Sequence, residues 1–570
     1  MIKRFGNIKN GIKLLVLVSI MAMSTNSFAQ ESEKPYKNQL ISVENKLKSG
    51  NLTDALLEME KITEKYPDAA EIFYGKAILL GQMGNVDGAL ENARLAFDKD
   101  KSLLYGNYII DILKDKNQLT DALPIAEVLY DKFSANSGVV RNYIALLADS
   151  KNLDQAKLIY SKELNKGHQT DTLDLVMAES YLLAEKFSDA KALLLPLQGK
   201  SKLQQAYSML AFVYGKEKND KESIAVLENG INLTKEPILY LDLADAYKNT
   251  GKILKSFEAL KKAFDSDKVP FADKYRIMLN VMNPNAKDFS KDQVYELANS
   301  LVLHHPRMAE SHMLKGEVLW GRGNIGEARS LFLTAIGINP RQIDAWRMLI
   351  NADLSLNQPD AAIQHGQEAL SANPNNTILL YFTGIGYMVK EDLTNARALL
   401  ESALNVSENE NPYVKSMIYS SLGDLYHQMK LESASDVAYE EAIQLDSTNV
   451  SAMNNYAYYL AVRNKKLDEA ATYAKQANEI DPSSGTFQDT YAWVLFKQNK
   501  YKEALVWIEK SIKSTKEPSS VLYEHYGDIL SKLNKTSDAL KNWQKALTIS
   551  TKEEDTKKIQ EKIKLKKYVD

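Results

Sequence analysis

The sequence predicts an all-α protein built as a solenoid of paired helices. Three observations lead to this prediction. Small residues recur every 33 or 34 positions over long stretches of the 570-residue chain, a second small residue precedes many of them by 12 positions, and glycine and proline are sparse, at 25 and 14. A chain of this length is too long for one hydrophobic core, so either several domains or a repeat array is expected. The fixed period favours the repeat array.

The small residues form two phased blocks. They are Ala55, Ala89, Ala122, Ala156, Ala190, Ser223 and Ser256, followed by Ala328, Ala362, Ala396, Ser435, Ala470, Ala504 and Ala539. Twelve positions earlier, Ala178 precedes Ala190 and Gly316 precedes Ala328. Two helices that pack closely need small side chains where their backbones approach. The constant offset therefore places one small residue on each arm of a helical hairpin.

The remaining positions of the repeat resemble a known family. Residues 309–340 carry Gly316, Ala328, Phe332, Ala335 and Pro340 in the order typical of the tetratricopeptide repeat. About fifteen such units are recognisable between about residue 36 and about residue 551. The resemblance implies a right-handed α-solenoid of helix-turn-helix repeats whose first helices line a concave groove. A charged segment, residues 552–570, is predicted to form a C-terminal capping helix that shields the last hydrophobic face.

The repeat phase weakens in the middle of the chain. Residues 268–292 contain Val269-Pro270 and Asn283-Pro284 and show no convincing first helix. We therefore predict an N-terminal sub-solenoid at 30–267, a degenerate repeat or junction at 268–306, and a C-terminal sub-solenoid at 307–551.

The N-terminus has the order of residues typical of a secretory signal peptide. Lys3, Arg4, Lys9 and Lys13 precede the apolar residues 14–23, and a polar stretch then ends at Ala29. This pattern predicts Sec-type export with cleavage of residues 1–29, and the periplasm as the location of the mature protein. The apolar core is half the roughly 20 residues that a membrane-spanning helix needs. No membrane insertion is expected after cleavage.

Charge and motifs exclude several classes of function. The net charge is −3, and it becomes −7 when the four basic residues of segment 1–29 are removed. An acidic protein is not expected to bind nucleic acid. The chain has no cysteine and no phosphate-binding loop, zinc-helix or nucleophile-elbow motif. His304, His305 and His312 could approach one another, but no carboxylates complete a metal site. We expect these histidines to lie at the solvent-facing end of a repeat instead. We predict no cofactor, no metal and no catalytic residue.

The predicted function is a non-catalytic scaffold or adaptor for protein–protein interaction in the bacterial periplasm or envelope, with partner segments held in the concave groove. The alternative is a structural subunit of an envelope assembly or secretion machine. The repeats leave no segment long enough for a separate catalytic domain.

The groove residues follow from a helical-face rule. Positions −3, +1 and +4 from the small residue of each first helix lie on one helical face. In the C-terminal repeats the rule selects a groove of aromatic and acidic residues without lysine or arginine, and we expect its aromatic side chains to be exposed. Its members are Tyr381, Met388, Asp424, His427, Asn454, Tyr458, Asp489, Trp493, Phe496, Glu524 and Asp528.

Such a groove would bind a segment carrying lysine or arginine next to an apolar anchor. The alternative is that the groove is filled by its own curvature or by the terminal cap. The corresponding face of the N-terminal repeats has fewer aromatic and acidic residues, because it is interrupted by Asn107, Ala145, Ala148 and Ser208.

Overall fold

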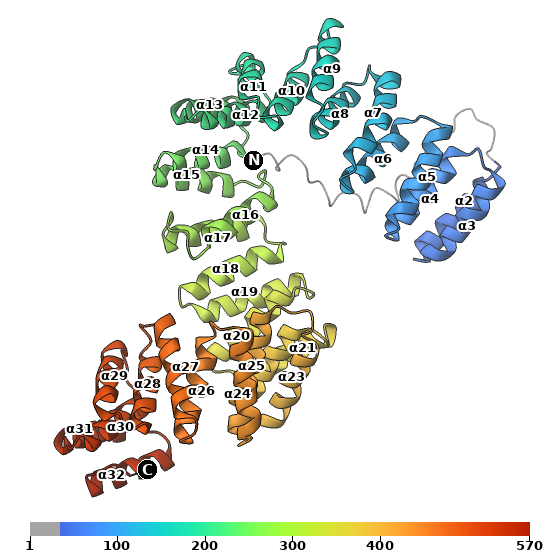
Figure 1. Cartoon of the computed structure of the whole chain (residues 1–570). Coiled ribbons are helices and arrows are strands. Elements are labelled where there is room, and N and C mark those ends of the chain that lie inside the picture. The colour runs from blue at the N-terminus through green and yellow to red at the C-terminus, as the bar shows by residue number, and fades with distance from the viewer. Residues whose placement is uncertain (1–34, 570) are drawn as a thin grey trace. The chain divides into compact units, whose positions relative to one another are not determined.

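The computed structural model describes residues 35–569, which contain thirty-one α-helices, one short 3₁₀ helix and no strand (Figure 1). The predicted signal peptide, residues 1–29, lies outside the described residues. The chain divides into two compact units, the first ending at Lys274 and the second beginning at Tyr275. Each unit is a stack of helices that pack in consecutive pairs. The predicted all-α solenoid class is confirmed.

Unit 1 contains seven helix pairs followed by the start of α16. Its helices are α2 (Lys37–Lys48), α3 (Leu52–Lys65), α4 (Ala70–Gln82), α5 (Val86–Lys99), α6 (Leu103–Asp115), α7 (Leu119–Phe133), α8 (Ser137–Asp149), α9 (Leu153–Asn165), α10 (Asp171–Leu183), α11 (Phe187–Leu194), η2 (Leu195–Leu197), α12 (Gln204–Lys216), α13 (Asp220–Thr234), α14 (Leu239–Asn249), α15 (Ile253–Phe264) and α16 (Phe271–Val281), the last of which crosses the boundary.

Unit 2 continues the same pattern and ends on an unpaired helix. Its helices are α17 (Lys291–His304), α18 (Ala309–Gly321), α19 (Ile325–Ile338), α20 (Ile343–Ser355), α21 (Pro359–Ala372), α22 (Thr377–Val389), α23 (Leu393–Asn405), α24 (Pro412–Gln428), α25 (Glu432–Leu445), α26 (Val450–Val462), α27 (Leu467–Ile480), α28 (Gly485–Lys497), α29 (Tyr501–Ser514), α30 (Ser520–Lys532), α31 (Thr536–Ile549) and α32 (Glu553–Leu565). Helix α32 lies within the charged segment expected to form a cap.

The small residues lie where the two helices of a hairpin meet. Ala328 and Ala504 are fully buried. At two positions the contact is direct: the Ser223 hydroxyl donates to the Ala211 carbonyl at 3.0 Å, and the Ser435 hydroxyl donates to the Gly423 carbonyl at 2.8 Å. These partners are 12 residues apart, which is the offset read from the sequence.

The turns between paired helices are short because one residue adopts a left-handed conformation. Gly84, two residues after the last residue of α4, has φ +82°. The Asn85 amide then donates to the Leu80 carbonyl at 2.9 Å, which satisfies a group left open by the helix end. The Asn85 side chain accepts from the Gly88 amide and so caps α5. One residue therefore closes the first helix and the next begins the second.

The prediction that residues 268–292 lack a first helix is wrong, because α16 occupies 271–281. A buried lysine joins this helix to the preceding one. The Lys274 ammonium donates to the carbonyls of Phe264 and Ser266, both at 2.8 Å, at the end of α15. Burial lowers the pKa of Lys274 to about 8. The helix was missed because Met278, 34 positions after Ala244, occupies the position where the earlier first helices carry a small residue.

First helices of successive hairpins also touch one another. In unit 1, α8 contacts α10, α10 contacts α12, and α12 contacts α14. In unit 2, the same holds along α20, α22, α24, α26, α28 and α30. We call these surfaces the N-terminal wall (α8, α10, α12, α14) and the C-terminal wall (α22, α24, α26, α28, α30). Among residues 35–569, no helix is long and apolar enough to cross a bilayer.

Candidate functional site

All eleven groove residues predicted from the sequence lie on helices of the C-terminal wall, but they form two different environments. The first surrounds Asp424 on α24. Its carboxylate accepts hydrogen bonds from the hydroxyls of Tyr439 at 2.5 Å and Tyr459 at 3.3 Å, and from the Asn455 amide at 3.1 Å. Burial raises the pKa of Asp424 although these three hydrogen bonds oppose the shift.

Asp424 opens onto a cavity of about 410 Å³ that is also lined by Tyr381, the exposed Tyr413 and Asn455. The Tyr381 hydroxyl lies 3.1 Å from the Ser421 hydroxyl in the same cavity. The structure therefore brings Tyr381 and Asp424 together, as members of one polar hollow.

His427, Asn454 and Met388 do not line this cavity. The His427 ring stacks on Tyr459 with centroids 3.6 Å apart, and burial lowers its pKa. Asn454 is buried and donates to the Asn455 side chain at 3.2 Å, while its own Oδ1 has no hydrogen-bond partner within residues 35–569. Met388 is half-buried and packs against the core around Leu380.

The second environment is an aromatic stack at the end of the wall. Trp493 lies between His525 and Phe496, with ring centroids 4.0 Å and 4.8 Å away. Asp489 holds His525 through a 2.9 Å contact between Oδ1 and Nδ1, and the Tyr458 ring lies 6.4 Å from His525. Trp493, Phe496, His525 and Asp489 therefore form one contact network.

The terminal helix α32 supplies the cation that the predicted groove lacked. The Lys562 ammonium donates to Glu524 at 2.6 Å and to Asp528 at 2.7 Å. Trp543 donates to the other oxygen of Asp528 at 2.9 Å. Burial raises the pKa of Asp528 to about 6 against the opposing effect of Lys562. For Lys562 the carboxylates of Asp528 and Glu524 outweigh burial, so its pKa is raised.

The aromatic end of the predicted groove is therefore covered by the chain itself. The Tyr568 ring packs edge-on against Phe496 at 5.1 Å, and its backbone amide donates to Ser531 at 3.0 Å. Trp493 is 8% exposed and Phe496 3% exposed, so the expectation that these aromatics are exposed is wrong. The helical-face rule did not include what the terminal helix would cover.

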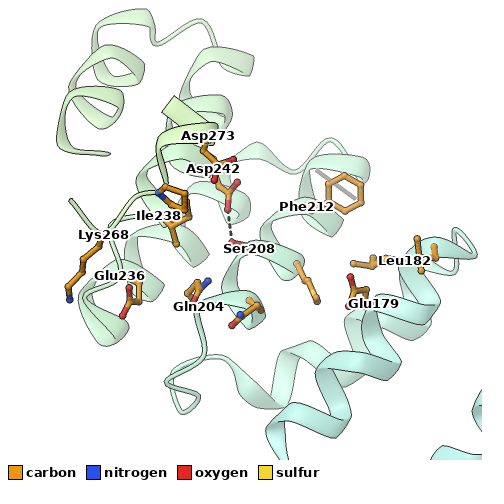
Figure 2. A pocket seen from close by; sticks show the side chains of 14 residues that line it. Glu179, Leu182, Gln204, Ser208, Phe212, Glu236, Ile238, Asp242, Lys268 and Asp273 are labelled. Atoms are coloured by element: carbon orange, nitrogen blue, oxygen red, sulfur yellow. Dashed lines mark hydrogen bonds between the residues drawn. The ribbon is translucent and has the colours of Figure 1, made fainter. Parts of the chain in front are cut away.

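A pocket on the N-terminal wall was missed from the sequence. It encloses about 310 Å³ between α10, α12, the segment before α14 and the segment before α16 (Figure 2). Figure 2 shows Glu179 and Leu182 on one side and Glu236, Ile238 and Lys268 on the other. The complete lining is Glu179, Leu182, Leu183, Gln204, Gln205, Ser208, Met209, Phe212, Glu236, Ile238, Asp242, Lys268, Pro270 and Asp273.

Carboxylates dominate the charge around this pocket. Burial raises the pKa of Glu179, and the nearby carboxylate of Asp149 raises it further. No hydrogen bond or ion pair to the Glu179 carboxylate occurs among residues 35–569. Asp242, in contrast, accepts from the Ser208 hydroxyl at 2.5 Å (Figure 2).

The same positional rule could have found part of this pocket. Glu179 and Phe212 are at +1 from Ala178 and Ala211, and Ser208 is at −3 from Ala211. The segments that close the pocket, around Glu236 and Lys268, lie outside helices. Helical periodicity cannot place them, so the pocket was not predicted.

Histidines and acids do not gather into a metal site in the part of the chain that is described: no group of three or more side chains there could hold an ion. His312 is instead within 2.9 Å of the Pro306 carbonyl through Nε2.

Comparisons with known proteins identify the repeats. Models of the tetratricopeptide repeat match residues 238–269, 296–343 and 418–449, so the chain carries tetratricopeptide repeats. Human protein O-mannosyl-transferase TMTC3 is 24% identical over 195 residues, which are 34% of this chain. The match spans only 21% of the length of that protein.

Solved structures of helical repeat proteins are also similar. A tetratricopeptide repeat protein from Parabacteroides merdae has a TM-score of 0.35 at 20% identity, over 45% of this chain and 98% of that one. The structure of the APC/C hetero-tetramer Cut9–Hcn1 has a TM-score of 0.39 at 15% identity, over 91% of this chain and 99% of that one. YrrB, described as a tetratricopeptide repeat protein with an unusual peptide-binding site, gives 0.27 at 21% identity, over 36% and 97%.

Proposed function

We propose that this protein is a non-catalytic scaffold that binds other proteins through its first-helix walls, in the bacterial periplasm or envelope. Tetratricopeptide repeats generally mediate protein–protein interaction, and stacked repeats create extended binding surfaces. One observation carries the proposal for this chain: the N-terminal wall has an open pocket with apolar walls and a half-buried carboxylate that no residue in 35–569 pairs. Helix pairs and the terminal helix α32 fill the described residues from 37 to 565, which supports binding rather than catalysis.

Capture of partners tests this proposal. Phe212 lines the pocket and Leu158 is 60% exposed on the second helix α9. We expect full-length protein to capture specific proteins from an envelope extract of its native host and Phe212→Ser to lose most of that capture, because apolar anchors at the centre of an interface carry much of the binding free energy. Leu158→Ser should behave like the wild type. Equal capture by Phe212→Ser, or loss on Leu158→Ser, would contradict binding on this wall.

The proposed location rests on the leader-like N-terminus and has its own test. Mass spectrometry of the protein purified from its native host should find an N-terminus near Gln30, because the basic, apolar and small-residue order of residues 1–29 is what signal peptidase recognises. Recovery of the chain with Met1 intact from the cytoplasmic fraction would rule out the periplasmic assignment while leaving the scaffold role standing.

A further inference from the structure

We propose that the pocket on the N-terminal wall binds a peptide segment in which one lysine or arginine side chain stands next to an apolar side chain, with Glu179 as the partner of the cation. This inference rests on the proposed scaffold function and names the chemistry of the partner.

The apolar part of the pocket has room for a side chain. Leu182, Met209, Phe212, Ile238 and Pro270 contribute its hydrophobic lining. Its volume, about 310 Å³, lies at the lower end of the range of ligand pockets. Phe212 is half-buried, and its ring is positioned by an edge-on contact with Phe187 at 6.4 Å. An apolar side chain inserted here would be desolvated on several sides.

Glu179 supplies the second half of the recognition. A carboxylate that loses water without gaining a cation or a hydrogen bond is costly. Burial and the neighbouring Asp149 both disfavour its ionised form, while Lys114 favours the ionised form of Asp149. A ligand cation beside Glu179 would remove this cost and add a charge-assisted hydrogen bond.

The charge balance of the lining selects against acidic ligands. Two carboxylates of the lining, those of Glu179 and Glu236, have no hydrogen-bond or ion-pair partner among residues 35–569, and the lining holds one ammonium, that of Lys268. A second lysine, Lys216, lies outside this lining, with its ammonium 5.3 Å from the Phe212 ring centroid. The excess of negative charge would attract a basic segment and repel an acidic one.

The shape of the site favours a peptide over a small amine. A second cavity of about 230 Å³, lined by residues of α12, α13 and α14 that include Lys216, shares Phe212 and Asp242 with the pocket. A ligand that occupied both cavities would pass the shared residues Phe212 and Asp242, which an extended segment can do and a compact amine cannot. A small polyamine would meet the carboxylates without using the apolar lining.

Selection from a displayed library of random nine-residue peptides against the full-length protein tests the inference. We expect the enriched peptides to carry lysine or arginine within two positions of an apolar residue. The tightest peptide is then measured calorimetrically against wild type, Glu179→Gln, Phe212→Ala and the control Leu158→Ala. Glu179→Gln should weaken binding at least about tenfold, because a desolvated ion pair loses one partner. Phe212→Ala should weaken it comparably, and Leu158→Ala should not.

A matched change in the peptide isolates the ion pair. Replacing its basic residue with norleucine should cost the wild type about tenfold and cost Glu179→Gln little, since the two changes remove the same contact. Circular dichroism melting checks that Glu179→Gln is folded, which is expected because glutamine is a neutral isostere of a carboxylate whose ionisation burial disfavours.

Three results would overturn the inference. The enriched peptides could lack basic residues, the peptide could bind Glu179→Gln and the wild type with equal affinity, or spermidine could displace the peptide at an equal concentration. If Phe212→Ser loses host partners but no basic peptide is enriched, the scaffold function stands and this inference fails. If binding of a selected peptide depends on Glu179 but Phe212→Ser captures host proteins as well as the wild type does, the pocket binds peptides as inferred. The proposal that the scaffold holds its partners through this pocket then fails.

Discussion

Replacing Lys562 with methionine should destabilise the last repeats of unit 2 by about 3–5 kcal/mol at neutral pH, as expected when one partner of a buried ion pair is removed. The Lys562 side chain is 6% exposed and that of Asp528 is 1% exposed. Methionine fills a similar volume, so the loss reports mainly the missing charge. Hydrogen exchange of peptides from residues 485–565, with chemical denaturation, measures the change.

The loss should also depend on pH. The pKa of Asp528 is raised to about 6 in the folded protein. At pH 5 Asp528 is mostly protonated and needs its cation less, so Lys562→Met should cost less than at pH 8. A carboxyl whose pKa is higher in the folded than in the unfolded state lowers the free energy of unfolding as pH rises from the unfolded pKa to the folded pKa. For Asp528 this interval runs from 3.8 to about 6.

The matched control for this prediction is Lys558→Met. Lys558 lies on the same helix, its side chain is 57% exposed, and it pairs with Glu554 one turn away. Such a surface pair contributes at most about 1 kcal/mol. A loss at Lys562 no greater than that at Lys558 would mean that α32 does not hold the end of the C-terminal wall.

Truncating Phe332 to alanine should cost about 3–5 kcal/mol in unit 2, the usual range for removing a buried aromatic ring. Phe332 is fully buried on α19, and its ring lies where a side chain on Gly316 of α18 would be: a Cβ at Gly316 would be 2.5 Å from the ring. The two residues fill the junction of one hairpin, so the truncation leaves a cavity there.

The neighbouring position gives the control. Leu333 on the same helix is 37% exposed, and Leu333→Ala should cost about 1 kcal/mol or less. Because repeats contact mainly their neighbours, hydrogen exchange should report the damage from Phe332→Ala in unit 2 and leave the exchange of unit 1 unchanged. A uniform loss of protection in both units would contradict this local account of stability.

Most of the fold could be predicted from the sequence because its cause is local and repeated. One small residue per helix, at a constant offset, determines which faces of a hairpin meet, and Ser223 and Ser435 contact the carbonyls 12 residues before them as that offset requires. The exception is instructive. Helix α16 carries Met278 at the position of the small residue, 34 residues after Ala244, so the pattern that identifies the other hairpins does not detect it.

The candidate site could be predicted only in part. The helical-face rule placed all eleven predicted residues on the C-terminal wall, because the wall is made of regular helices. The rule reads one helix at a time, so it favoured an open groove; at Asp528 and Phe496 the structure shows the alternative, a groove covered by the C-terminal segment through Lys562 and Tyr568. Likewise, non-helical segments around Glu236 and Pro270 close the N-terminal pocket, and their position depends on the packed structure.

The most direct test of the central claim is to locate a bound partner on the wall. A photoreactive amino acid placed at Phe212, and separately at Leu158 on the second helix α9, is irradiated in living cells of the native host. The account predicts crosslinked adducts with a discrete set of proteins from position 212 and none from position 158. Adducts from position 158 with none from position 212 would contradict the claim that this protein holds its partners on the first-helix wall.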